Sequence, residues 1–275
     1  MDRQTITSRA NPMITETAKL TDRKYRQKSR LFCFEGHKLL SEALDAGVSL
    51  ERIFVTERAE ERYKELLSRT ACPVFSVSDG VYEKISVENA PEGVFCVAKY
   101  LDNLIFSHII YMKRSHFPTI IGEAVSAERI LLCEGLQDPG NLGTVIRTAN
   151  ALGFDRVVLS EGSADIYHPR TIRGAMGALF RLPVDITPDM PAYIASLKDA
   201  GYTVLAAALR DDAMPLGTFP VTEKTVFVIG NEGHGLSDAV LSACSGSVII
   251  PMAPGAESLN ASVAAALLMW ERARA

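Results

Sequence analysis

Long hydrophobic runs and paired cysteines are both missing from this chain of 275 residues. No stretch of 18 apolar residues occurs, and a membrane-spanning helix needs one, so we expect no membrane partner. The five cysteines are odd in number and form no C-x-x-C pair, which argues against a disulfide framework and predicts that no metal is bound. The first twelve residues lack an apolar segment, so we expect no secretory signal and a cytoplasmic location.

A strong charge of one sign is also missing, because the net charge is −4. That balance argues against a protein that is basic over its whole surface. The two parts of the chain differ, since residues 1–127 hold 18 basic and 17 acidic residues, whereas residues 128–275 hold 11 and 16. A cluster of cations in the first part suits contact with phosphates, although a solvated helix face has the same composition. This cluster comprises Arg23, Lys24, Arg26, Lys28 and Arg30.

Hydrophobic residues make up 47% of the chain and charged residues 23%, which are the values of a folded globular protein. Segments with strand character alternate with helical segments over residues 1–100 and again from residue 129 onward, which predicts an α/β fold. In the second part the strand segments are almost continuously apolar, as in a parallel sheet that is covered on both faces. We therefore predict a domain at 1–100, a linker or insertion at 101–127, and a second domain at 128–275.

The individual elements follow from hydrophobic spacing. The predicted helices span 12–30, 37–46, 57–68, 81–85, 141–152, 171–178 and 260–273. The predicted strands span 32–34, 52–56, 73–77, 93–98, 130–133, 156–159, 202–207, 225–229 and 247–250.

Three loops follow predicted strands, and each opens a helix. Ligands of a parallel α/β sheet bind outside the carboxyl ends of its strands, so these loops are the expected site. The loops read GLQDPGNLG at 135–143, GNEGHGLS at 230–237 and PMAPGAESLN at 251–260. Their glycines let a ligand approach the backbone closely. Ordinary turns and helix caps use the same residue types, and that plainer interpretation stays open for each loop taken alone.

A nucleotide-dependent oxidoreductase is a different interpretation of the glycine loops. Such an enzyme carries G-x-G-x-x-G after a strand and an acidic residue near the end of the next strand. The loop at 135–143 has neither feature in the expected place. The sequence therefore argues against a dinucleotide site.

Taken together and in order, the three loops resemble the signature motifs of the SpoU (TrmH-like) family of RNA ribose 2′-O-methyltransferases, which belongs to the SPOUT superfamily. Arg173 and residues 176–184 also resemble the family's segment between the first two motifs. Residues 30–44 are similar to its N-terminal RNA-binding domain, a small ribosomal-protein-like α/β fold. The matching motif segments are QDPGNLGTVIRTANALGFDRVVL at 137–159, FVIGNEGHGLS at 227–237 and IPMAPGAESLNASVAAALL at 250–268.

The resemblance implies a C-terminal domain with a parallel sheet and a deep trefoil knot, preceded by a small α/β domain that binds RNA. It implies a homodimer whose sites combine groups from both chains. It also implies S-adenosylmethionine as the cofactor, held largely by backbone groups. The implied cofactor-binding residues are Gly230, Asn231, Gly233, Ile250, Met252, Ser258 and Leu259.

The implied reaction is methyl transfer to a ribose 2′-hydroxyl of structured RNA, with Arg147 activating that hydroxyl. An arginine guanidinium normally stays protonated in proteins. Whether Arg147 removes the hydroxyl proton or stabilises the developing alkoxide therefore stays open. The resemblance completes the catalytic set with groups that position the ribose, Arg147 and the cofactor: Asn141, Glu232, Ser258 and Asn260. We expect RNA contacts at the cation cluster and at Arg173.

We predict ribosomal RNA as the substrate, with transfer RNA as the alternative, and no residue pattern distinguishes the two. A non-catalytic RNA-binding protein with the same fold is a further alternative, and the intact catalytic set argues against it. The methylated nucleotide is not specified by any of these patterns.

Overall fold

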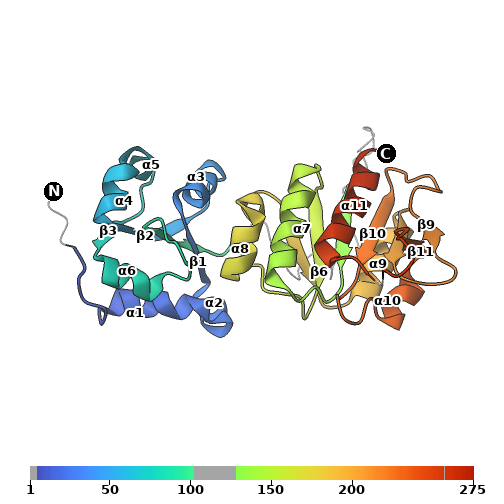
Figure 1. Ribbon diagram of the computed structural model, residues 1–275, viewed down its shortest axis with the longest axis horizontal. Coiled ribbons are helices and arrows are strands. Elements are labelled where there is room, and N and C mark those ends of the chain that lie inside the picture. The colour runs from blue at the N-terminus through green and yellow to red at the C-terminus, as the bar shows by residue number, and fades with distance from the viewer. Residues whose placement is uncertain (1–4, 102–127, 257) are drawn as a thin grey trace. The chain divides into compact units, whose positions relative to one another are not determined.

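The computed structural model of the protein describes residues 5–101, 128–256 and 258–275. The chain divides into two compact units, and most of their elements are labelled in Figure 1. The first unit contains residues up to Leu101 and also Asp165–Phe180, and the rest of the chain forms the second. This division differs from the predicted domains, 1–100 and 128–275, because it groups residues 165–180 with the first unit. The linker or insertion predicted at 101–127 lies outside the described residues, apart from Leu101.

The first unit is built on a sheet with the strand order β1-β4-β2-β3 in the described part of the chain. Strand β4 runs antiparallel to β1 and β2, and β3 runs parallel to β2. The strands are β1 (Leu31–Glu35), β2 (Leu50–Thr56), β3 (Val74–Val77) and β4 (Val94–Lys99). The helices are α1 (Pro12–Ala18), η1 (Lys19–Thr21), α2 (Arg23–Ser29), α3 (His37–Asp45), α4 (Glu57–Arg62), α5 (Lys64–Ser68) and α6 (Asp79–Ile85).

Two long helices predicted for the first unit are each divided in the structure. The helix predicted at 12–30 is interrupted at Asp22, whose backbone is extended and whose carboxylate accepts a hydrogen bond from the Tyr25 N–H at 2.9 Å. Such a side-chain cap starts a new helix. The helix predicted at 57–68 is interrupted at Tyr63, which ends α4 and precedes α5.

Residues 165–180 cover one face of the first sheet. They form α8 (Pro169–Ala175) and the short helix η2 (Ala178–Phe180). The Phe180 ring lies 5.4 Å from that of Phe34, and the Tyr167 ring lies 4.8 Å from that of Phe32. The intervening residue, Cys33, packs with α1 and α6 on the opposite face, as the alternation of side chains along a strand requires. Residues distant in sequence therefore complete the core of the first unit.

The second unit contains a parallel sheet, as predicted. Over the described residues its strand order is β7-β6-β5-β10-β8-β11-β9, and every adjacent pair is parallel. Strands β7 and β9 were not predicted, because β7 includes the polar residue Asp185 and β9 has two exposed residues. The strands are β5 (Ile130–Cys133), β6 (Arg156–Ser160), β7 (Val184–Thr187), β8 (Thr203–Ala207), β9 (Met214–Pro215), β10 (Thr225–Ile229) and β11 (Gly246–Ile249).

Helices cover both faces of this parallel sheet. Helices α7 (Pro139–Ala151) and α11 (Ala261–Ala273) lie side by side on one face (Figure 1). Helices α9 (Met190–Asp199) and α10 (Asp238–Ala243) pack on the other, where Ile194 and Val240 meet Leu132 and Val228. Helix α9 was not predicted. The trefoil knot stays a prediction from the resemblance. Among the described residues, no helix combines the length and the apolar character needed to cross a bilayer.

Candidate active site

The loops singled out from the sequence all leave the carboxyl edge of the parallel sheet. They follow β5, β10 and β11, and β8 lies between β10 and β11 in the strand order. The loop after β8, residues 208–213, therefore reaches the same edge, although the sequence analysis missed it. The loop contains no glycine motif, so its place at this edge can be inferred only from the strand order of the sheet. The Ala208 N–H donates to the Val248 carbonyl at 3.1 Å, and Leu209 is 64% exposed.

A chain of side-chain hydrogen bonds joins the three predicted loops. The Asn260 amide nitrogen donates to the Asn141 Oδ1 at 3.0 Å, and the Asn141 amide nitrogen donates to the Glu232 Oε1 at 2.7 Å. Asn141 is half-buried, whereas Glu232 and Asn260 are exposed. Three residues that are distant in the sequence thus form one polar cluster, the Asn260–Asn141–Glu232 network.

The helix caps next to this network differ from those predicted. Helix α7 begins at Pro139 and is capped by Asp138, whose carboxylate accepts from the Asn141 N–H at 2.8 Å. Hydrophobic spacing predicts a start at Asn141, and the observed earlier start leaves the Asn141 side chain available for the network. Asn260 does cap α11, because its Oδ1 accepts from the Ser262 N–H at 2.9 Å. Its amide nitrogen still reaches Asn141, so Asn260 combines both roles.

The glycine loop after β10 closes on itself at Gly230. A Cβ atom at this position would lie 2.4 Å from the carbonyl carbon of Gly235, which is closer than real Cβ contacts. Asn231 and Gly235 exchange two backbone hydrogen bonds of 2.9 Å. The Asn231 side chain donates to the Gly135 carbonyl at 2.8 Å and accepts from the Gly233 N–H at 2.7 Å. Asn231 therefore fixes the glycine loop and ties it to the loop after β5.

Glu134 is a further residue that the sequence analysis missed. Its two carboxylate oxygens accept from the Ser237 hydroxyl at 2.7 Å and from the Ser237 N–H at 2.8 Å. This contact fixes the start of α10 to the end of β5, and an acidic residue directly after a buried strand was the available signal. Burial raises the pKa of the neighbouring Cys133 thiol well above its usual value, so that thiol stays protonated.

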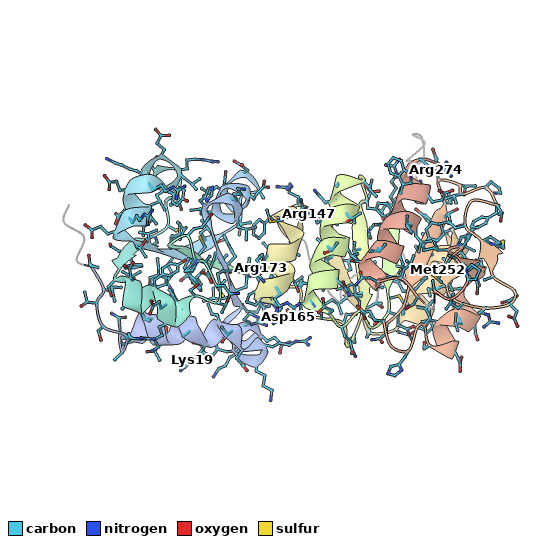
Figure 2. The ribbon with its side chains drawn as sticks, in the orientation of Figure 1. Lys19, Arg147, Asp165, Arg173, Met252 and Arg274 are labelled. Atoms are coloured by element: carbon cyan, nitrogen blue, oxygen red, sulfur yellow. The ribbon has the colours of Figure 1, made fainter. Side chains whose placement is uncertain are left out.

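Arg147 lies on α7, the helix that also carries Asn141 (Figure 2). Its side chain is exposed, while Leu142, Val145 and Ile146 of the same helix are buried. Within the described residues, its guanidinium has no ion-pair partner. The cation is therefore presented to solvent from a helix that is fixed by its apolar face.

The loop between β11 and α11 has apolar side chains close to glycine backbone that no other atoms cover. Leu259 is 39% exposed, Ile250 and Met252 are half-buried, and Ser258 is exposed (Met252 is labelled in Figure 2). At Gly235 and Gly255, nothing lies within 4 Å of the place where a Cβ would stand. Open backbone with apolar neighbours fits a flat, uncharged group such as the adenosine part of S-adenosylmethionine. The described residues hold no group of three or more side chains suited to a metal ion.

The predicted RNA contacts fall in the first unit, and one of them is wrong. Arg26 is 1% exposed, and its guanidinium donates to the Leu20 carbonyl at 2.7 Å and to the Asp165 carboxylate at 2.6 Å. Its side chain lies on the buried side of α2 and stabilises the fold. Arg173 is exposed and forms an ion pair with Glu88. The exposed members of the cation cluster are Arg23, Lys24, Lys28 and Arg30.

Comparison with known proteins finds a matching family for each of two parts of the chain. The family described as the SpoU rRNA Methylase family matches residues 128–270, and the MRM3-like substrate binding domain matches residues 11–96. The chain is 33% identical over 265 residues to the 23S rRNA (guanosine(2553)-2′-O)-methyltransferase RlmP of Bacillus subtilis (strain 168). That alignment covers 96% of this chain and 97% of the relative.

Solved structures resemble the whole chain as well. A crystal structure of an RNA 2′-O ribose methyltransferase has a TM-score of 0.80 and 30% identity, and the match covers 98% of both chains. An AdoMet-bound rRNA methyltransferase from Sinorhizobium meliloti has a TM-score of 0.81 and 26% identity, over 98% of this chain and 97% of that one.

Proposed function

The chain belongs to the SpoU rRNA methylase family, and on that premise we propose how its loops methylate RNA. The protein is an S-adenosylmethionine-dependent methyltransferase that acts on a ribose 2′-hydroxyl of ribosomal RNA. The observation that supports the residue roles is the Asn260–Asn141–Glu232 network, because it unites the three motif loops at the ligand-binding edge of the sheet.

The loops after β10 and β11 bind the cofactor in this proposal. S-adenosylmethionine supplies a methyl group that is already activated by a sulfonium, so the protein must align the donor with the acceptor. We propose that backbone groups at Gly230, Gly233, Ile250 and Leu259 hold the cofactor. Met252 and Ser258 line the same loop, and Asn231 keeps the glycine loop closed.

Arg147 acts on the acceptor oxygen. Methyl transfer draws negative charge onto the 2′-oxygen, and a cation held beside that oxygen stabilises the charge. Because a guanidinium stays protonated in proteins, we assign Arg147 to charge stabilisation, and the hydroxyl proton leaves to water. Arg147 and Asn141 lie six residues apart on α7, about 9 Å along the axis at 1.5 Å per residue. The helix thereby fixes the cation relative to the network.

The function is tested by methyl transfer to defined RNAs. Cofactor labelled with tritium in its methyl group should label ribosomal RNA from cells that lack the gene, and the label should map to a 2′-O-methylated nucleotide. Label in transfer RNA alone would contradict the ribosomal assignment. Cofactor binding without any transfer would indicate the non-catalytic alternative.

We propose that the second unit forms a homodimer through α11. Helix α11 buries Ala265, Leu268 and Met269 in its own unit. Its outer side exposes Val263, Leu267 and Trp270, at 47%, 41% and 58%. Their spacing of four and three residues places them on one stripe. Exposed apolar patches mark interfaces, and pairing of the same surface across a two-fold axis is the commonest arrangement.

Changing this stripe should produce a monomer. In the double variant Leu267→Lys and Trp270→Lys, two cations would face their copies, so sedimentation velocity at micromolar concentration should show half the wild-type mass. The matched control is Val87→Lys, which changes an exposed apolar residue of the first unit and should leave the mass unchanged. A double variant that keeps the wild-type dimer mass would place the interface elsewhere.

Neutralising the exposed cations of α2 should weaken RNA binding. The triple variant Arg23→Gln, Lys24→Gln and Lys28→Gln should lower the slope of log affinity against log salt by about 2, because each phosphate contact releases roughly 0.7–0.9 counterions. Cofactor affinity should stay unchanged. Fluorescence anisotropy with ribosomal RNA fragments between 50 and 200 mM salt, about the range where this effect is large, measures the slope.

The matched control changes Arg58→Gln, Arg62→Gln and Lys64→Gln, three exposed cations on α4 and α5 of the same unit. An equal loss of slope in both variants would show that general charge, and not the α2 surface, determines RNA affinity. Arg26 is left unchanged, because removing one partner of its buried ion pair would lower the stability of the fold and so obscure any effect on RNA affinity.

A further inference from the structure

A column of planar side chains runs from the core of the first unit to its surface beside the cation cluster. The Phe32 ring, which is buried, lies 4.8 Å from that of Tyr167. Tyr167 stacks on Tyr100 at 3.9 Å with an interplanar angle of 21°. The Arg30 guanidinium lies over the Tyr100 ring at 4.7 Å, and Arg30 is exposed. The column therefore ends in a guanidinium at the surface.

The backbone holds Arg30 in an uncommon conformation at this point. Arg30 ends α2 in the left-handed region, with φ 55° and ψ 32°. Its N–H donates to the Arg26 carbonyl at 2.8 Å, and its carbonyl accepts from the Tyr100 N–H at 2.9 Å. Glycine is the usual residue at such a helix end, because it avoids the clash of a Cβ atom. Arg30 carries a Cβ atom in this conformation, so the backbone is strained where the side chain lies over Tyr100.

The charges around the column suit a polyanion. The exposed residues Arg23, Lys24 and Lys28 lie on α2, and the sequence from 23 to 31 has no acidic residue. Burial and the nearby Asp165 raise the pKa of Tyr100 to about 12, against the opposing effect of Arg26, Arg30 and Arg23. Tyr100 thus stays a neutral ring below the Arg30 guanidinium.

We propose that Arg30, supported by Tyr100, forms a stacking site for one unpaired nucleobase of the substrate RNA. Guanidinium planes and aromatic rings both stack on bases that are splayed out of a helix. The cations of α2 would bind the phosphates on either side of that base. A paired base has both faces covered by its neighbours in the duplex, so the site selects single-stranded nucleotides. The proposal rests on the RNA-methylating function and adds a means of choosing the substrate.

The test compares two RNAs of the same sequence and length. One is a 12-nucleotide single strand with a central 2-aminopurine, and the other is its blunt duplex. The variant Arg30→Lys keeps the charge and removes the plane. It should weaken binding of the single strand about 10-fold, which is within the range measured for loss of one base stack. Duplex affinity should change less than about 2-fold, and the quenching of 2-aminopurine should disappear.

Two further variants separate stacking from folding. Arg30→Gly should lose single-strand binding to a similar extent while its melting temperature stays equal to or above that of the unaltered protein, since glycine suits this backbone. Met176→Gly is the matched control, because Met176 is also left-handed, with φ 48°, and should leave RNA binding unchanged.

The outcomes separate this site from the function on which it rests. Equal affinities of Arg30→Lys and the unaltered protein for both RNAs would overturn the stacking site alone. An equal loss for single strand and duplex would show that Arg30 acts only as a phosphate contact, and would overturn it too. Failure of the unaltered protein to bind the single strand, while it still methylates ribosomal RNA, would overturn the site and leave the proposed function standing.

Discussion

Replacing Arg147 with alanine should lower the rate of methyl transfer about 1,000-fold and change cofactor affinity less than about 2-fold. Loss of one preorganised group that stabilises developing charge has effects of this size on reaction rates. Arg147 is exposed on α7, so its removal leaves the apolar face of that helix intact. Single-turnover transfer from tritiated S-adenosylmethionine measures the rate, and calorimetric titration measures the affinity.

Two variants on the same helix sharpen this test. Arg147→Lys should recover less than a tenth of the lost activity, because an ammonium lacks the planar fork that reaches a ribose oxygen and a phosphate together. Thr148→Ala should be near wild type, because the Thr148 hydroxyl donates to the Thr144 carbonyl at 2.9 Å within the helix. Full activity in Arg147→Ala would remove Arg147 from the catalytic set.

Replacing Gly230 with alanine should abolish cofactor binding, with an affinity loss of about 100-fold or more. The added Cβ would meet the carbonyl carbon of Gly235 at 2.4 Å and the backbone nitrogen of Leu236 at 2.7 Å. Both neighbours are backbone atoms, so relief requires opening the turn between Asn231 and Gly235. Opening that turn displaces the backbone groups proposed to hold the cofactor. Calorimetric titration with S-adenosylmethionine checks the result.

Gly246→Ala is the matched control for Gly230→Ala. A Cβ at Gly246 would meet the Leu205 side chain at 3.7 Å, an ordinary van der Waals contact. This control should bind cofactor as the unaltered protein does. Circular dichroism should show that Gly230→Ala keeps its secondary structure. Normal cofactor affinity in a folded Gly230→Ala protein would mean that the cofactor does not depend on this loop.

The parallel sheet and the loops at its edge were predictable because they depend on local patterns. Continuous apolar strands, glycine turns and their order along the chain can be recognised from the sequence alone. The hydrogen bonds between Asn260, Asn141 and Glu232 were not, because they depend on which strands become neighbours. Strand β10 pairs with β5 across almost a hundred residues, and no local pattern specifies that pairing; only the family resemblance grouped the three residues.

The same limit explains why the burial of Arg26 and the packing of residues 165–180 were not predicted. Charge clustering placed Arg26 among the RNA contacts, since composition does not distinguish the buried from the exposed side of a short helix. Its partner Asp165 lies 139 residues away. The resemblance placed Arg173 and residues 176–184 in the C-terminal domain, whereas the contacts of residues 165–180 group them with the first unit. Tyr167 and Phe180 have no local pattern that reveals their packing on β1.

The packing of residues 165–180 against β1 sets an order of events during protein synthesis. The first unit lacks Tyr167, Ile172 and Phe180 until residue 180 has left the ribosome. By then β5 and β6 of the other unit have been made as well. The N-terminal unit therefore matures only after synthesis of the catalytic unit has begun, and a gene fragment ending at residue 101 would encode an unfinished module.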